Sequence, residues 1–359
     1  MGSLLGKKVA VVANQTSVIG KTHIVDSLLA LKVSVVKVFA PEHGFRGDAG
    51  AGETIADGKD KKTGIPLISL YGKNKKPTNE MLSGIDIIVF DIQDVGARFY
   101  TYISTMHYVM EAAAANKIPV IVLDRPNPNG FYIDGPVLQP SYKSFVGMHP
   151  IPVVHGLTVG ELAKMINGEK WLDGDLVCDL TVVPCENYRH SDHYMLPVKP
   201  SPNLPNMAAI YLYPSLCWFE GTAISVGRGT EKPFQWIGYP GNKTGKQQYT
   251  PHDISGVATD PPHEGKLCNG HDLEEFGLNF IPSSKAIYLD WIVGMYETYP
   301  DKSTFFTTPD FFDKLAGSAE LRKQLIEGKN ASEIRKSWET DISAYKKTRK
   351  KYLLYPDFE

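Results

Sequence analysis

The sequence predicts an α/β protein, with a parallel sheet in its first part and a second, smaller domain after it. Short apolar stretches rich in valine alternate with segments of helical spacing up to residue 123. This order is typical of βαβ units, whose right-handed crossovers place helices on both faces of a sheet. Polar residues also follow most of the expected strands, which is typical of the ligand-binding edge of an open α/β sheet.

The first domain is expected to contain five strands. The clearest are the runs 33–40 and 85–90, because short, continuously apolar runs are typical of strands buried on both faces. Ile24, Val25 and Leu28 recur at helical spacing. The expected strands cover 7–13, 33–40, 66–70, 85–90 and 119–123, and the expected helices cover 19–31, 79–82 and 101–116.

A second domain is expected after a stretch rich in glycine, proline and aromatic residues. We place the boundary near 145–149, so that it separates residues 1–147 from residues 148–359. Thr158 and Glu161 have the spacing of a capping box, which predicts a helix there. The proline-rich segment 200–206 must be irregular. Further expected elements are a strand at 179–183 and helices at 289–299 and 332–352.

The composition excludes several classes of protein. The 359 residues carry a formal net charge of −2, without the basic stripe that nucleic-acid binding requires. No apolar run approaches the roughly 20 residues of a membrane span. Met1-Gly2-Ser3 lies almost directly before the first expected strand, which indicates a chain trimmed of its signal peptide. We therefore expect a periplasmic or extracellular protein, and its oligomeric state is left open.

No cofactor and no metal are expected. No GxGxxG motif follows the first strand, and Gly227-Arg228-Gly229-Thr230 lacks the P-loop pattern, so dinucleotide and ATP binding are not indicated. His190-Ser191-Asp192-His193 fits no familiar metal spacing. The four cysteines form no CxxC pair, and a disulfide between Cys178 and Cys185 is left open.

Five polar side chains stand just past expected strands, namely Asn14, Glu42, Asp91, Asp94 and Asp124. Because the carboxyl ends of parallel strands share one edge, these side chains are expected near one another. Glu42 and His43 could be an acid and its modulator, or a cap on the following turn. Asp91 and Asp94 could serve as a base, a nucleophile, metal ligands or acceptors for sugar hydroxyls. Alternatively, Asp91 fixes the loop and Asp94 caps the next helix.

Three arginines near expected loops are candidates for an anion clamp, namely Arg98, Arg125 and Arg228. The guanidinium fork matches a carboxylate or a phosphate, although pairing with Asp94 or Asp124 is the structural alternative. Tyr100 and Tyr102 could stack on sugar rings, but a single aromatic residue more often belongs to the core.

These residues lie in motifs that resemble the NamZ/YbbC family of exo-β-N-acetylmuramidases. The resemblance spans nearly the whole chain, and its motifs occur in the same order. They are Pro41-Glu42-His43-Gly44, the run 91–102, Asp124-Arg125-Pro126-Asn127-Pro128, Pro200-Ser201-Pro202-Asn203, Phe219-Glu220-Gly221-Thr222 and Gly227-Arg228-Gly229-Thr230. The resemblance implies a Rossmann-like domain beside a smaller α/β domain, with the site in the cleft between them. It also implies a glycosidase that releases terminal N-acetylmuramic acid from peptidoglycan fragments in cell wall recycling.

The resemblance makes Glu42 the leading catalytic residue, with Asp91 and His43 as further catalytic candidates. The expected substrate-binding residues are Asn14, Arg46, Asp94, Arg98, Tyr100, Tyr102, Asp124, Arg125, Asn203, Glu220 and Arg228. Arginines suit the lactyl carboxylate of N-acetylmuramic acid, and Asp, Asn and Tyr suit its hydroxyls and acetamide.

Glycoside hydrolysis requires an acid and a second group that stabilises an oxocarbenium-like transition state. That second group is left open among Asp91, Asp94, Asp124, Glu220 and the substrate's own acetamide, and so is the choice between retention and inversion. Two other function classes are also left open. One is a non-catalytic glycan-binding protein on the same scaffold. The other is a metal-dependent phosphoesterase that uses Asp91, Asp94 and His43.

Overall fold

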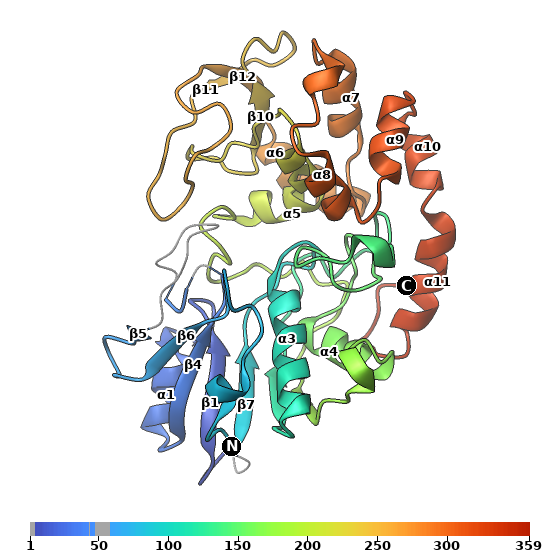
Figure 1. Ribbon diagram of the computed structural model, residues 1–359. Coiled ribbons are helices and arrows are strands. Elements are labelled where there is room, and N and C mark those ends of the chain that lie inside the picture. The colour runs from blue at the N-terminus through green and yellow to red at the C-terminus, as the bar shows by residue number, and fades with distance from the viewer. Residues whose placement is uncertain (1–3, 43, 47–57) are drawn as a thin grey trace.

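The computed structural model describes residues 4–42, 44–46 and 58–359. Its first lobe is built on a seven-stranded sheet of order β5-β6-β4-β1-β7-β8-β9 (Figure 1). All neighbouring strands are parallel except β5 and β6, so the predicted α/β architecture is confirmed. The strands are β1 (Lys8–Ala13), β4 (Ser34–Ala40), β5 (Gly58–Lys59), β6 (Pro66–Ser69), β7 (Ile87–Asp91), β8 (Val120–Leu123) and β9 (Leu180–Val183).

Apolar side chains cover both faces of this sheet. Val9 and Val11 of β1 pack with Val25 and Leu28 of the first helix, whereas the alternate residues of β1 belong to the larger core that includes the third and fourth helices. Burial on both faces explains why these strands are apolar throughout instead of alternating. The helices of this lobe are α1 (Ile24–Ala30), α2 (Asn79–Leu82), α3 (Tyr102–Ala115) and α4 (Val159–Gly168).

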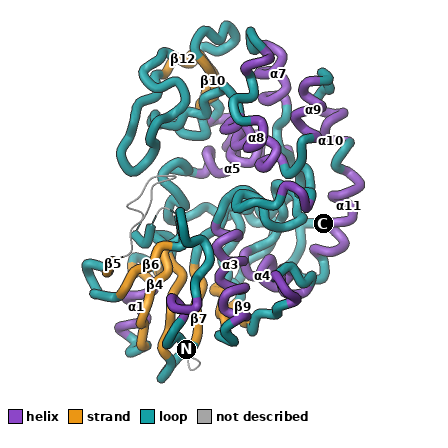
Figure 2. Tube along the Cα trace, in the orientation of Figure 1, coloured by secondary structure: helices purple, strands orange, loops and turns teal. Residues whose placement is uncertain are grey.

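The second lobe combines a small antiparallel sheet of order β10-β12-β11 with helices (Figures 1 and 2). Its strands are β10 (Trp236–Tyr239), β11 (Gln247–Tyr249) and β12 (Cys268–Asp272). The helices from here to the chain end are α5 (Met207–Leu216), α6 (Glu274–Ser284), α7 (Asp290–Thr298), α8 (Pro309–Ala316), α9 (Glu320–Ile326), α10 (Ala331–Lys336) and α11 (Glu339–Arg349). Short 3-10 turns lie at Pro140–Tyr142, Asp173–Asp175, Cys217–Gly221 and Lys302–Thr304.

The chain end returns to the first lobe. The Tyr345 hydroxyl of α11 donates to the carbonyl oxygen of His155 at 2.6 Å, and the buried Arg349 guanidinium donates to the carbonyl oxygen of Gly156. The main sheet also continues past residue 147, because β9 pairs in parallel with β8. The division into residues 1–147 and 148–359 stays a prediction.

The expected helix at 19–31 begins later than predicted. A hairpin of β2 (Val18–Ile19) and β3 (Thr22–His23) occupies its first part, and α1 starts at Ile24. Gly20 has a φ of 60° in the two-residue turn of this hairpin, a conformation that glycine adopts without strain. His23 then caps α1 by accepting from the backbone N–H of Val25.

The expected helix at 332–352 is divided into α10 and α11. The break lies at Ser337 and Trp338. The Ser337 hydroxyl donates back to the carbonyl oxygen of Ile334 at 2.6 Å, a contact that bends helices. Trp338 is buried and contacts Trp218 edge-on. The predicted capping box of Thr158 and Glu161 is confirmed at the start of α4.

Candidate active site

A pocket of about 490 Å³ opens between the carboxyl edge of the main sheet and the second lobe. On the sheet side, its lining includes Glu42 after β4, Tyr71 after β6 and Thr101 at the start of α3. The second lobe contributes residues of the α5 region, of two later loops and of α8. These are Tyr213, Cys217, Glu220, Arg228, Ala258, Thr259, Asp260, Pro261, Pro262, Phe311 and Leu315.

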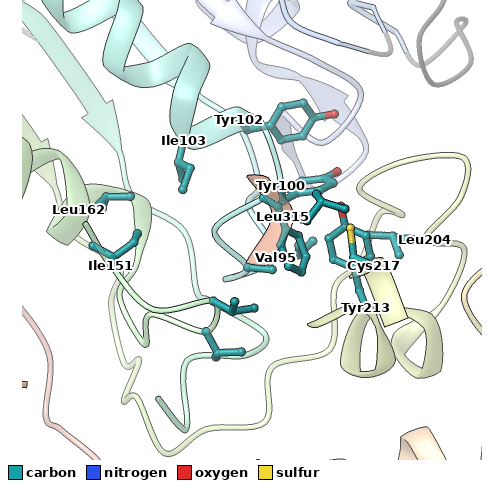
Figure 3. Packing of buried hydrophobic residues seen from close by; sticks show 14 of the residues in the cluster. Val95, Tyr100, Tyr102, Ile103, Ile151, Leu162, Leu204, Tyr213, Cys217 and Leu315 are labelled. Atoms are coloured by element: carbon teal, nitrogen blue, oxygen red, sulfur yellow. The ribbon is translucent and has the colours of Figure 1, made fainter. Parts of the chain in front are cut away.

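A smaller hollow of about 60 Å³ adjoins this pocket. The two cavities share Glu42, Phe99, Thr101, Tyr213 and Arg228, so they form one continuous site. The hollow adds a further set of lining residues, namely Tyr100, Ser201, Asn203, Leu204 and Phe234. Tyr100, Leu204 and Tyr213 lie together in Figure 3.

Glu42 is half-buried at the sheet side of both cavities. Its Oε2 accepts a hydrogen bond from Thr101 Oγ1 at 2.7 Å. Thr101 stands at the N-cap position of α3, but its hydroxyl makes no capping bond to the helix and is used for Glu42 instead. Tyr71 lines the same pocket, and burial first, then the charge of Glu42, raises the pKa of Tyr71.

Glu220 and Arg228 form an ion pair in the lining of the large pocket, with 2.5 Å between Arg228 Nε and Glu220 Oε1. Both side chains are about one-fifth exposed, at 19% and 21%. The guanidinium lies over the ring of Phe234, with 5.1 Å between its carbon and the ring centroid. Among the described residues, the terminal nitrogens of Arg228 have no hydrogen-bond partner, so they are available to an anionic ligand.

The structure places Asp91 and Arg125 outside the pocket lining. Arg125 Nε donates to Asp91 Oδ1 at 2.6 Å, and the Asp91 carbonyl oxygen accepts from the Ser17 hydroxyl. Asn14 lies in the same buried layer, where its Oδ1 accepts from the Thr16 backbone and hydroxyl at 2.9 and 2.6 Å. These residues hold the strand-end loops in place. They do not line either cavity.

Asp94 belongs to the tight loop between β7 and α3. Its Oδ2 accepts from the backbone N–H of Gly96 at 2.6 Å, and burial raises the pKa of Asp94 to about 7. A Cβ on Gly96 would lie 2.1 Å from Asn127 Oδ1, so only glycine fits this turn. The loop therefore fixes the direction in which the chain reaches Phe99 and Thr101.

The side chains of Asp124 and Arg98 also form hydrogen bonds in the interior of the protein. Asp124 accepts from the Thr158 hydroxyl, the Gly160 N–H and the Tyr355 hydroxyl, and burial raises the pKa of Asp124 to about 6. Arg98 is fully buried and donates to the carbonyl oxygens of Pro136, Ile151 and Leu315. Burial lowers the pKa of Arg98 to about 9. Neither side chain reaches the pocket.

Of the other predicted residues, Arg46 forms an ion pair outside both cavities, and two tyrosines bind the segment 200–206. Arg46 makes a forked ion pair with Asp60, at 3.0 and 2.9 Å, and this pair holds the pKa of Asp60 well below its usual range. The hydroxyls of Tyr100 and Tyr102 both donate to the carbonyl oxygen of Pro200, at 2.9 and 3.2 Å. They thereby hold the irregular 200–206 segment against the sheet edge. His43 lies outside the described residues.

The predicted set is thus divided. Glu42, Tyr100, Asn203, Glu220 and Arg228 meet at the cavities, whereas Asn14, Arg46, Asp91, Asp94, Arg98, Tyr102, Asp124 and Arg125 do not line them. The sequence analysis missed several polar lining residues, namely Tyr71, Lys75, Thr101, Ser201, Tyr213, Thr259 and Asp260. Tyr71 follows an expected strand, so the rule that identified Glu42 would have found it. Lys75 and Thr101 carried no comparable signal.

Several general expectations can be compared with the described part of the chain. All four cysteines are free thiols, so the Cys178–Cys185 disulfide is not formed. Within the ranges 4–42, 44–46 and 58–359, no three or more His, Cys, Asp or Glu side chains form a group suited to a metal ion. None of the helices described has the length and apolar character needed to cross a bilayer.

Comparison with known proteins gives matches along nearly the whole chain. Models for the N-terminal and C-terminal parts of the exo-β-N-acetylmuramidase NamZ match residues 9–208 and 211–355. The peptidoglycan β-N-acetylmuramidase NamZ of Bacillus subtilis strain 168 is 43% identical over 371 residues, covering 98% of this chain and 88% of that protein.

Two crystal structures of DUF1343 family proteins from Bacteroides fragilis NCTC 9343 share the fold. One has a TM-score of 0.91 and 46% identity, covering 99% of this chain and 96% of the other. The second has a TM-score of 0.79 and 30% identity, covering 99% of this chain and 95% of the other. Both matches span nearly the whole of this chain and therefore include both lobes.

Proposed function

The chain belongs to the NamZ family of exo-β-N-acetylmuramidases, and on that premise we propose that the pocket around Glu42 cleaves the bond of terminal N-acetylmuramic acid. The protein is a glycosidase that acts on peptidoglycan fragments. One observation supports the choice of pocket. A half-buried carboxyl group with a fixed orientation lies in the same cavity as an arginine whose terminal nitrogens are available.

Glu42 is the general acid in this proposal. It protonates the oxygen of the leaving group while the bond at the anomeric carbon breaks. The hydrogen bond from Thr101 holds the carboxyl group in one orientation, so its proton points in one direction. A general acid must be placed within hydrogen-bond reach of the oxygen that it protonates.

Glu220 is the second group that we propose. Of the carboxylates that the sequence left open, Glu220 lines the pocket with Glu42, whereas Asp91, Asp94 and Asp124 are held in interior networks. The ion pair with Arg228 keeps Glu220 oriented. An ionised carboxylate there would stabilise the positive charge that develops on the sugar ring.

Arg228 binds the lactyl carboxylate. Its Nε is used by Glu220, and its two terminal nitrogens can take the two oxygens of a carboxylate in a bidentate pair. Arg98 and Arg125 donate to acceptors in the interior. Of the three predicted arginines, Arg228 is therefore the one that lines the cavity.

The acid assignment is tested with Glu42→Gln, which keeps the side-chain shape and removes the acidic proton. We expect kcat on a natural muramyl disaccharide to fall roughly 10²–10⁴-fold, with unchanged folding and binding. The loss should be smaller on a glycoside with an activated leaving group, which needs less protonation. Wild-type turnover of the disaccharide by this variant would refute the role of Glu42.

The lactyl assignment is tested by comparing N-acetylmuramyl with N-acetylglucosaminyl glycosides. Wild-type protein should prefer the muramyl substrate, and Arg228→Met should lose roughly 10–100-fold of that preference, which corresponds to 1.5–3 kcal/mol for a charged hydrogen bond. Lys75→Met is the matched control, because Lys75 is the other cation lining the large pocket. Selectivity that depends on Lys75 and not on Arg228 would contradict the assignment.

We also propose that the protein acts in the periplasm or outside the cell, in cell wall recycling. The support is chemical, since the peptidoglycan polymer lies outside the cytoplasmic membrane. Fractionation of the source cells, followed by immunodetection, tests this location. Recovery of the protein with cytoplasmic markers alone would contradict it.

A further inference from the structure

The small hollow beside Glu42 has five aromatic or aliphatic residues in its lining, namely Phe99, Tyr100, Leu204, Tyr213 and Phe234. The rest of its lining is polar, formed by Glu42, Thr101, Ser201, Asn203 and Arg228. The rings of Tyr100 and Tyr213 meet edge-on, with 6.0 Å between centroids (Figure 3). A volume of about 60 Å³ exceeds what one water molecule needs and is suited to a group of a few heavy atoms.

Asn203 is one of the polar residues that line this hollow. Only 2% of the residue is exposed, and its Nδ2 donates to the carbonyl oxygen of Val257 at 2.8 Å. This bond fixes the orientation of the amide. Its Oδ1 is buried and has no hydrogen-bond partner among the described residues. A buried carbonyl oxygen without a donor is costly, so the site is prepared for a ligand that brings an N–H.

The position of the hollow matches the order of groups on the muramic acid ring. The leaving group is on C1, the acetamido group on C2 and the lactyl ether on C3, so the three substituents are neighbours. Glu42 and Arg228 both line the hollow, and we have assigned them to the C1 and C3 substituents. A ligand that satisfies both must direct its C2 substituent into the space between them.

We propose that the hollow binds the 2-acetamido group, with its N–H donated to Asn203 Oδ1 and its methyl against the aromatic wall. Asn203 is therefore a specificity-determining residue. It receives the amide N–H while the aromatic residues pack against the acetyl methyl, which the de-N-acetylated sugar lacks. This inference rests on the proposed muramidase function of the same site.

The test uses three chromogenic muramyl glycosides that differ only at C2, with an N-acetyl group, an N-propionyl group or a free amine. Wild-type protein should hydrolyse the N-acetyl substrate with a kcat/KM at least about 10-fold above the free amine, which has no acetyl group to bury against the aromatic residues of the hollow. The propionyl substrate should also be slower, because the hollow is narrow. Equal rates on the acetyl and amine substrates would overturn the inference but leave the proposed function intact.

Asn203→Asp separates a recognition role from a merely structural one. The carboxylate favours an ammonium over an amide, so the ratio of kcat/KM between the acetyl and amine substrates should fall about 10-fold or more. Damage to the fold alone would lower both rates and leave the ratio unchanged, and that result would overturn the inference. Asn269→Asp, which adds the same charge in β12 outside both cavities, should keep the wild-type ratio.

A binding measurement covers the case in which the Asn203 variants fail to fold. Isothermal titration of wild-type protein with free N-acetylmuramic acid and with muramic acid should show tighter binding of the acetylated sugar. Equal affinities would overturn the inference. Failure of the wild-type protein to hydrolyse any muramyl glycoside would overturn both this inference and the proposed function.

Discussion

At the scale of single residues, the three arginines predicted to bind an anion have different structural roles. Arg98 holds three carbonyl oxygens in the interior, Arg125 holds Asp91, and Arg228 lines the cavity. Each guanidinium is positioned by the acceptors that the fold brings to it. The exposed fraction separates them further, because Arg98 is fully buried whereas Arg228 keeps one-fifth of its surface.

Replacing Arg98 should therefore affect folding and not substrate selectivity. Arg98→Met leaves the carbonyl oxygens of Pro136 and Leu315 without the Arg98 donor, whereas that of Ile151 keeps the Leu138 N–H, and each buried group without a donor costs roughly 1–3 kcal/mol. We expect the free energy of unfolding to fall by about 3 kcal/mol or more in urea denaturation. Protein that remains folded should keep the wild-type preference for muramyl over glucosaminyl substrates. Loss of that preference at unchanged stability would show that Arg98 contacts the substrate.

Thr101 should act as a positioning residue for Glu42. Thr101→Val keeps the shape and removes the hydroxyl that donates to Glu42 Oε2. A hydrogen bond to a neutral carboxylic acid contributes roughly 0.5–1.5 kcal/mol, so kcat should fall about 2–10-fold with little change in KM. Thr101→Ser keeps the hydroxyl and should restore most of the activity. If Thr101→Val raised KM and left kcat unchanged, the side chain would instead bind the substrate directly.

At the scale of elements, the site depends on where strands end and how the following loops turn. β4, β6 and β7 end at one edge of the sheet, and the loops after them carry Glu42, Tyr71 and Thr101. The C-terminal helix α11 and the tail after it act on the opposite flank. There, Tyr355 donates to Asp124 and accepts from the N–H of Cys185.

Tyr355→Phe should destabilise the protein more at high pH than at low pH. Burial raises the folded-state pKa of Asp124 from 3.8 to about 6, so the folded protein holds this proton more tightly than the unfolded chain. The free energy of unfolding therefore falls as the pH rises from the ordinary pKa of 3.8 to the folded-state pKa of about 6. The Tyr355 hydroxyl favours the ionised form, and its removal raises the folded-state pKa further.

The expected loss for Tyr355→Phe is about 1–3 kcal/mol at pH 8 and less at pH 5. Thermal melts of both proteins from pH 4.5 to 8.5 measure the difference. Tyr352→Phe, which removes a hydroxyl bonded to the less buried Glu169, is the matched control and should show a smaller dependence on pH. An equal loss at all pH values for Tyr355→Phe would contradict the linkage to Asp124.

At the scale of the whole molecule, the two lobes share one interior. The larger core runs from Ala10 in the main sheet to Tyr345 in α11 without division. Polar contacts cross between distant parts of the chain, such as Asn129 Nδ2 to the Ile210 carbonyl oxygen at 3.1 Å and Arg98 to the Leu315 carbonyl oxygen at 2.9 Å. The cleft is therefore bounded by lobes that support each other.

This shared core predicts one cooperative unfolding transition and not two. Differential scanning calorimetry should give a single peak, and fluorescence and circular dichroism should report the same midpoint. Asp134→Ala removes the partner of Arg335 and of the Ile287 N–H, and it should lower the whole transition without splitting it. Two resolved peaks would show that the lobes fold as independent domains.

The amino-acid pattern by itself determined the α/β class, the order of the strands along the chain, and Glu42 and Arg228 as candidate site residues. The family resemblance added Asn203 and Glu220, which also line the cavities. Short buried strands and the polar residues after them are local features, and local features can be read from a sequence. Three-dimensional packing alone decided which carboxylates and arginines face the cavity. Asp91, Asp94 and Asp124 follow strands as Glu42 does, but their acceptor atoms meet Arg125, Gly96 and Thr158, which are placed there by the folded chain. The roles of Thr101 and Lys75 were also decided by packing, because their neighbours in the cavity come from distant segments that only the tertiary fold brings together.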